Sequence, residues 1–231
     1  PTTTTTTTTA AAGGAVAMAG TAAAAGTDGE RGRLMPLWSE AAPAGAPEWF
    51  VRAVDAPRQR GLVRVDASTQ LEYLRWESPR PDARGLVFVH GASANAHWYS
   101  FIAPFFSEEF DVVALTSSGC GSSDFRDKYT GEVFGDEIVA ATEKLGLFDR
   151  PDKPFLVTHS FGSIAGMSVA LRHGERFGGI ILTDVRLQDL PSHELRKHLA
   201  LAMKQRRESK QHQSRTAWQR YAASLPPVEK F

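Results

Sequence analysis

The sequence predicts an α/β protein built on a mainly parallel sheet with helices on both faces. Short runs of β-branched and other apolar residues, such as 85–91 and 111–116, are typical of strands buried on both faces of a sheet. Segments of helical length separate these runs, and this alternation indicates right-handed crossovers between parallel strands. Ligands of such sheets bind at the carboxyl ends of the strands, so we expect function where the strands end.

Each expected element carries a local signal. We expect strands at 62–66, 71–76, 85–91, 111–116, 155–160 and 178–184, the first two as a partly exposed pair. A helix is expected over 131–146, because its apolar residues fall on one helical face and Gly146 can end it. A second helix is expected over 161–174, where Gly174 closes the segment.

The two ends of the chain differ from this central part. Residues 1–50 open with a threonine tract followed by alanine and glycine, and we expect them to form a disordered tail. A targeting peptide is the less favoured alternative, because no Lys or Arg precedes Arg31. We expect the sheet core to span 51–185, and 186–231 to begin a helical lid.

Composition narrows the class of ligand. Acidic and basic residues balance at 26 each, so no strong positive field points to nucleic acid or an anionic membrane. The single cysteine, Cys120, excludes an internal disulfide, and no histidine pair has metal-site spacing, so we expect neither metal nor cofactor. No apolar run is long enough to span a bilayer. We expect a soluble protein, with the cytoplasm favoured, that binds a small-molecule substrate; its oligomeric state stays open.

A lone serine follows the strand "FLVTHS" and precedes the second expected helix. In an α/β sheet, a tight strand–serine–helix turn strains the serine backbone and raises its hydroxyl above the sheet. The flanking residues are Thr158 and Gly162, so the pattern is T-x-S-x-G, where G-x-S-x-G is the usual motif. The alternative role for Ser160 is a helix N-cap.

Two further strand ends stand out. "VFVHGA" ends on His90-Gly91-Ala92, where a backbone amide could face the serine as one oxyanion donor, with the amide of Phe161 as the other. An ordinary turn is the alternative reading of this loop. The second strand end, "SSGCGSSD", departs from the dinucleotide motif, and we expect a structural turn there.

Taken together, "VFVHGASANAHW", "VVALTSSGCGSSD", "FLVTHSFGS" and "RHGERFGGIILTD" resemble, in order and spacing, the α/β-hydrolase fold superfamily. The resemblance covers residues 61–185. It implies that Ser160 is the nucleophile, that the amides of Ala92 and Phe161 form the oxyanion hole, and that Trp98 lines the pocket.

The resemblance also implies an acid and then a histidine after the nucleophile. Asp184 ends the strand after Ser160, where some members of the superfamily carry their acid; a structural role is the alternative. His173 ends the helix after the serine, and the later histidines, His193, His198 and His212, fall in the expected lid. The adjacent His159 is expected to be a packing residue.

No histidine therefore stands where the superfamily places its base. We expect the sequence to be the amino-terminal part of a longer protein, as its first residue, Pro1, also indicates. The predicted function is a serine hydrolase acting on an ester or similar small carbonyl substrate. Because the base is missing, we expect the 231-residue form itself to be weakly active or inactive. The alternative is a non-catalytic binding protein or pseudoenzyme on the same fold.

Overall fold

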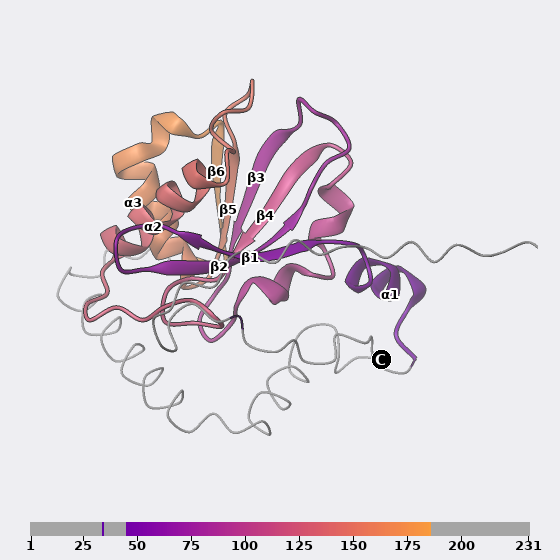
Figure 1. Cartoon of the computed structure of the whole chain (residues 1–231), viewed down its shortest axis with the longest axis horizontal. Helices are drawn as coiled ribbons and strands as arrows, with labels where there is room; N and C mark the ends of the chain where they lie inside the picture. The colour runs from indigo at the N-terminus through magenta and orange to yellow at the C-terminus, as the bar shows by residue number, and fades with distance from the viewer. Residues whose placement is uncertain (1–33, 35–44, 186–231) are drawn as a thin grey trace, which may run out of the picture. The chain divides into compact units, whose positions relative to one another are not determined.

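Six strands lie in one sheet in the order β1-β2-β4-β3-β5-β6 (Figure 1). The computed structural model describes residue 34 and residues 45–185. The strands β4, β3, β5 and β6 run parallel, whereas β2 runs antiparallel to both of its neighbours. This is the mainly parallel sheet that the sequence predicts. The bounds are β1 Gln59–Arg64, β2 Gln70–Trp76, β3 Arg84–Val89, β4 Phe110–Leu115, β5 Phe155–His159 and β6 Gly179–Thr183.

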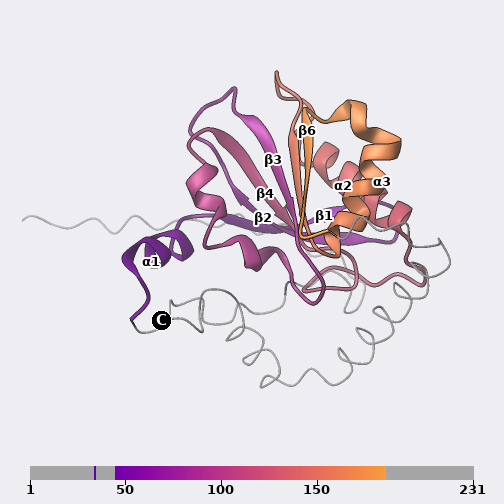
Figure 2. The ribbon, with the colours of Figure 1, turned by 180° about the vertical axis from the view of Figure 1, so that it is seen from behind.

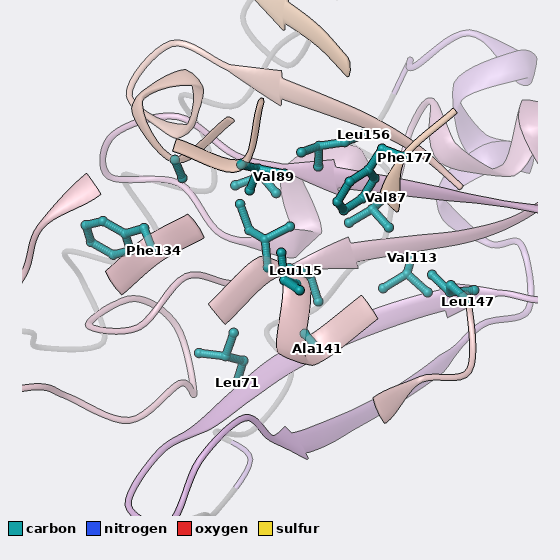
Figure 3. Packing of buried hydrophobic residues seen from close by; sticks show 14 of the residues in the cluster. Leu71, Val87, Val89, Val113, Leu115, Phe134, Ala141, Leu147, Leu156 and Phe177 are labelled. Atoms are coloured by element: carbon teal, nitrogen blue, oxygen red, sulfur yellow. The ribbon is translucent and has the colours of Figure 1, made fainter. Parts of the chain in front are cut away.

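Side chains of the central strands alternate between two apolar layers. Val87, Val113 and Leu156 point to one face and are fully buried there (Figure 3). Their neighbours in the sequence, including Phe88 and Val112, are buried on the opposite face. Strands with both faces buried need apolar residues at every position, which explains the continuous apolar runs of the sequence.

Helices cover both faces, as expected. Helices α2 (Gly131–Lys144) and α3 (Gly162–His173) pack on the Val87 face, opposite the short helices η1 (Ala96–Tyr99) and η2 (Ala103–Phe106) (Figure 2). The hydroxyl of Thr130 caps α2 by accepting from the Val133 amide, and Gly146 ends the helix with φ +72°.

Strand β2 corrects one expectation. It lies between β1 and β4, and it buries Leu71, Leu74 and Trp76 together with the charged Glu72. The prediction of a partly exposed pair therefore holds for β1, whereas β2 is more buried than expected, with its remaining residues only partly exposed. The sequence did not reveal that β2 is an inner strand.

The described part of the chain begins before the expected core. Helix α1 (Glu48–Val54) starts within the segment expected as a tail, and its Phe50 is buried and stacks on Phe101. The expected lid, 186–231, lies outside the described residues, as do residues 1–33 and 35–44 of the expected tail. The remaining described element is the short helix η3 (Gly174–Arg176). Among the described helices, none is both long and apolar enough to cross a bilayer.

Candidate active site

Ser160 occupies a strained turn between β5 and α3. Its φ is +50°, in the left-handed region that residues with a β-carbon rarely adopt. Hydrogen bonds hold this backbone on both sides: the Ser160 amide donates to the carbonyl of Thr183 at 2.9 Å, and the Ser160 carbonyl accepts from the Ser163 amide at 2.9 Å. The surrounding structure therefore imposes the strained conformation, as is typical of functional sites.

The geometry does not support the N-cap reading of Ser160. The residue at the N-cap position of α3 is Phe161, and no side chain caps this helix. No hydrogen bond joins the Ser160 hydroxyl to another residue within 45–185, and the side chain is only half-buried. The hydroxyl is thus left available for chemistry.

Residues with strained backbone conformations lie at the carboxyl ends of three neighbouring strands. Within the described residues, the non-glycine residues with positive φ are Ser93, Ser160 and Asp184, which follow β3, β5 and β6. Parallel strands place these ends at one edge of the sheet. Residues with strained backbones cluster at active sites, so this edge of the sheet is the candidate site.

Two glycines bring the loop after β3 against the turn at Ser160. A β-carbon on Gly91 would lie 3.1 Å from the β-carbon of Ser160 and 2.8 Å from Nδ1 of His159. A β-carbon on Gly162 would lie 2.5 Å from the carbonyl oxygen of His90. Glycine is therefore required at position 162, where the added atom would meet the backbone after β3, whereas a β-carbon at position 91 would press on the side chains of His159 and Ser160. Ala92 and Phe161, the two predicted oxyanion donors, directly follow Gly91 and Ser160.

His90 fixes the loop that carries Ala92. Its ring is buried, and its Nε2 accepts from the amide of Ser117 at 3.1 Å. This assigns the proton to Nδ1, which donates to the carbonyl of Gly91 at 2.8 Å. Because the two polar groups of a trans peptide point in opposite directions, the Ala92 amide is directed away from the His90 ring.

A glycine in the helix offsets the unusual Thr158. This threonine is fully buried, and a β-carbon on Gly166 of α3 would lie 2.8 Å from its Oγ1 and 3.0 Å from its Cγ2. The small residue that the motif usually places on the strand is thus supplied by the facing helix. The sequence analysis missed Gly166, although its spacing of one helical turn from Gly162 was a usable signal.

His159 bridges the loop after β3 and the end of β6. Its ring stacks on Trp98 with centroids 6.0 Å apart, and its Nε2 lies 3.6 Å from a carboxylate oxygen of Asp184. The Asp184 side chain is 75% exposed, so this pair is a weak one. These contacts agree with the expected packing role of His159 and put Trp98 beside the candidate site.

No histidine of the described region is hydrogen-bonded to Ser160. His173 pairs with Asp136 on the surface, which agrees with its expected place at the helix end. His193, His198 and His212 lie outside the described residues.

A buried carboxylate explains the glycine-rich turn after β4. Glu72 accepts hydrogen bonds from Arg60, from the Ser122 amide and from the hydroxyl of Thr116. Gly121 has a φ of +44°, and a β-carbon added at this position would lie 2.5 Å from the same carboxylate. This turn thus has the structural role that we expected.

The environment of Glu72 also sets its protonation. Burial raises the pKa of Glu72, but hydrogen bonds from His97, the Ser122 amide and Arg60, together with the charge of His97, outweigh burial and lower the pKa to about 2. The hydroxyl of Thr116 accepts from the Ala96 amide at 2.9 Å, which links this carboxylate to the loop that carries Ala92. Sequence reasoning missed Glu72, because a charged residue in a strand normally indicates a solvent-facing side.

Comparisons with known proteins agree with this architecture. The model of a family described as "Alpha/beta hydrolase family" matches residues 86–229. A haloalkane dehalogenase of Sphingobium indicum is 33% identical over 100 residues, which cover 41% of this chain and 33% of that protein. A probable proline iminopeptidase of Leptolyngbya boryana is 25% identical over 179 residues, which cover 76% of this chain and 51% of that protein.

Solved structures share the fold at low identity. The structure of E-2-(acetamidomethylene)succinate hydrolase matches with a TM-score of 0.52 and 18% identity, covering 63% of this chain and 51% of that one. The chain thus spans a third and about half of the lengths of the two curated relatives that it matches.

Proposed function

Because the chain belongs to the alpha/beta hydrolase family, we propose that it is a serine hydrolase with Ser160 as its nucleophile. The proposed substrate is an ester or a similar small carbonyl compound. The observation that carries the proposal is the φ of +50° at Ser160, in a turn between a buried parallel strand and a helix. The relatives named above are hydrolases by their names, which supports the reaction class.

The mechanism that we propose uses the contact between the two glycine-bearing loops. Ser160 Oγ attacks the carbonyl carbon while a base takes its proton, and the oxyanion accepts hydrogen bonds from the amides of Ala92 and Phe161. The tetrahedral intermediate expels the alcohol, which takes up the proton, and water then releases the acyl group. Loss of one oxyanion donor typically costs about 3 kcal/mol of transition-state stabilisation.

The chemistry of a serine favours carbonyl substrates over the alkyl halides named for one relative. Attack of Ser160 on an alkyl halide would form an ether, which water does not cleave under enzyme conditions. Attack on a carbonyl compound forms an ester, which water can hydrolyse to regenerate the enzyme. Halide removal is therefore not part of this proposal.

The proposed base lies outside the described residues. Asp184 remains a candidate acid, supported by its place after β6 and its positive φ, although its carboxylate faces His159 at 3.6 Å. A non-catalytic binding protein on the same fold is the competing function, and it predicts a Ser160 that no base activates.

Labelling with a fluorescent fluorophosphonate tests the proposal. We expect the protein, in a form that includes its base, to form a covalent adduct at Ser160, and we expect Ser160→Ala to abolish the adduct. Ser68→Ala is the matched control, because Ser68 is exposed in the turn between β1 and β2 and should label like wild type. Equal labelling of Ser160→Ala and wild type would refute the assignment, and a wild-type protein that folds but never labels favours the binding protein.

A further inference from the structure

Three hydroxyl groups and two backbone carbonyls are linked by hydrogen bonds next to the turn at Ser160. Thr158 Oγ1 donates to Ser163 Oγ at 3.1 Å, which is shorter than its other contact, 3.5 Å to the carbonyl of Ile181. Ser163 Oγ donates to the carbonyl of Thr183 at 3.3 Å. Thr183 Oγ1 in turn donates to the carbonyl of Thr158 at 2.9 Å. This hydroxyl set, Thr158, Ser163 and Thr183, joins β5, the first turn of α3 and the end of β6.

The carbonyl of Thr183 connects the hydroxyl set to the nucleophile. It accepts from Ser163 Oγ and also from the backbone amide of Ser160, at 2.9 Å. The second of these bonds is one of the two that hold Ser160 in its strained conformation. A change in how Ser163 binds this carbonyl is therefore transmitted to the Ser160 backbone.

Because two of these hydroxyls are buried, loss of a hydrogen-bond partner would cost each of them free energy. The side chains of Thr158 and Ser163 are fully buried, so a hydroxyl that loses its partner there cannot turn to water. The Thr158 hydroxyl fixes the direction of the Ser163 hydroxyl by donating to its oxygen. A glycine at this position, as in the usual G-x-S-x-G motif, would offer no such donor.

We propose that Thr158 is a positioning residue for Ser160, acting through its hydroxyl; this proposal rests on the proposed function. The hydroxyl set holds the Thr183 carbonyl against the Ser160 amide and so keeps Ser160 at positive φ. Threonine at the unusual position of the motif thus has a role, and Gly166 provides the space that its side chain needs.

The test compares Thr158→Val, which removes the hydroxyl with little change of shape, with Thr158→Ser, which keeps it. Two quantities are measured: kcat and KM with a short-chain p-nitrophenyl ester, and the hydrogen-exchange rate of the Ser160 amide. A net loss of one hydrogen bond corresponds to roughly a fivefold to tenfold effect. We expect Thr158→Val to lower kcat by roughly that factor with KM unchanged, and to accelerate exchange similarly, whereas Thr158→Ser restores both.

Two further variants keep the test decisive. Thr142→Val removes another buried threonine hydroxyl, which bonds to the Ile138 carbonyl within α2, and it should change neither readout. If Thr158→Val does not fold, Ser163→Ala removes the next hydroxyl of the set and is expected to give the same result.

The outcomes separate this proposal from the proposed function. Wild-type values of both readouts in Thr158→Val, or equal impairment in Thr158→Ser, would overturn the positioning role. If the wild-type protein neither hydrolyses esters nor reacts with fluorophosphonate, the proposed function fails. Exchange at the Ser160 amide then decides alone: acceleration in Thr158→Val with rescue in Thr158→Ser supports the role, and unchanged exchange refutes it.

Discussion

Replacing Gly162 by alanine tests the close approach on which the candidate site depends. The added β-carbon would lie 2.5 Å from the carbonyl oxygen of His90 and 3.0 Å from that of Val89. Both atoms belong to the backbone at the end of β3, so no side-chain rotation can relieve the contact. We expect Gly162→Ala to push the turn at Ser160 away from the loop that carries Ala92.

The size of the effect follows from these distances. Ordinary van der Waals contact begins near 3.4 Å, so the two backbones must separate by about 0.9 Å. Overpacking of this kind costs about 1–3 kcal/mol, whereas alanine in place of glycine gains up to about 1 kcal/mol in a helix. With the full gain subtracted, we expect a net loss of about 0–2 kcal/mol in the free energy of unfolding. A shift of about 1 Å at the reacting groups can lower the rate roughly a hundredfold.

Urea unfolding and the rate of fluorophosphonate labelling measure these two effects. Gly174→Ala is the matched control, because no atom lies within 4 Å of its added β-carbon. We expect this control to keep wild-type labelling and to be as stable as wild type or slightly more so. A Gly162→Ala protein with wild-type stability and labelling would refute the close-contact argument.

Three other predictions concern strain, acid and packing. Ser160→Gly should be about 1 kcal/mol more stable than Ser160→Ala in urea unfolding, because glycine tolerates the positive φ; equal stabilities would argue against strain. Because the pKa of Glu72 is lower in the folded chain, at about 2, than its ordinary value of 4.5, its stabilisation is complete above about pH 4.5 and is lost as the pH falls toward 2. Glu72→Gln should therefore remove on the order of 3 kcal/mol of this pH dependence, measured by urea unfolding between pH 5 and 2, and an unchanged dependence would contradict the assignment. Gly166→Ala should destabilise the protein by about 1–3 kcal/mol, and adding Thr158→Gly should recover part of that loss; strictly additive effects in the double-mutant cycle would show that the two positions do not compensate.

The sequence predicted the elements whose signals are local. Strands β3 and β4 are apolar at almost every position because both of their faces are buried, and this pattern is readable without a structure. The end of α2 at Gly146 was likewise predictable, since the chain needs a positive φ there. The strand–serine–helix order then placed Ser160 at a strand end.

Features that depend on distant partners were not predictable. The burial of Glu72 depends on Arg60 in β1 and on Ser122 in the turn after β4, and only the folded sheet brings these together. In the same way, the sequence shows only that Thr158 departs from the usual motif. The folded chain shows that Gly166 faces Thr158 and leaves space for its side chain. Helix α1 was not predicted because its seven residues are too few to show a clear helical pattern of apolar residues, and they follow a low-complexity segment.

We propose that the Ser160 hydroxyl faces two peptide amides across the site. A crystal structure of the protein after reaction with a fluorophosphonate would show whether it does. We predict phosphorus bonded to Ser160 Oγ, with the phosphoryl oxygen about 3 Å from the amide nitrogens of both Ala92 and Phe161. An adduct on another residue, or a phosphoryl oxygen directed away from both amides, would show that Ser160 does not face an oxyanion hole.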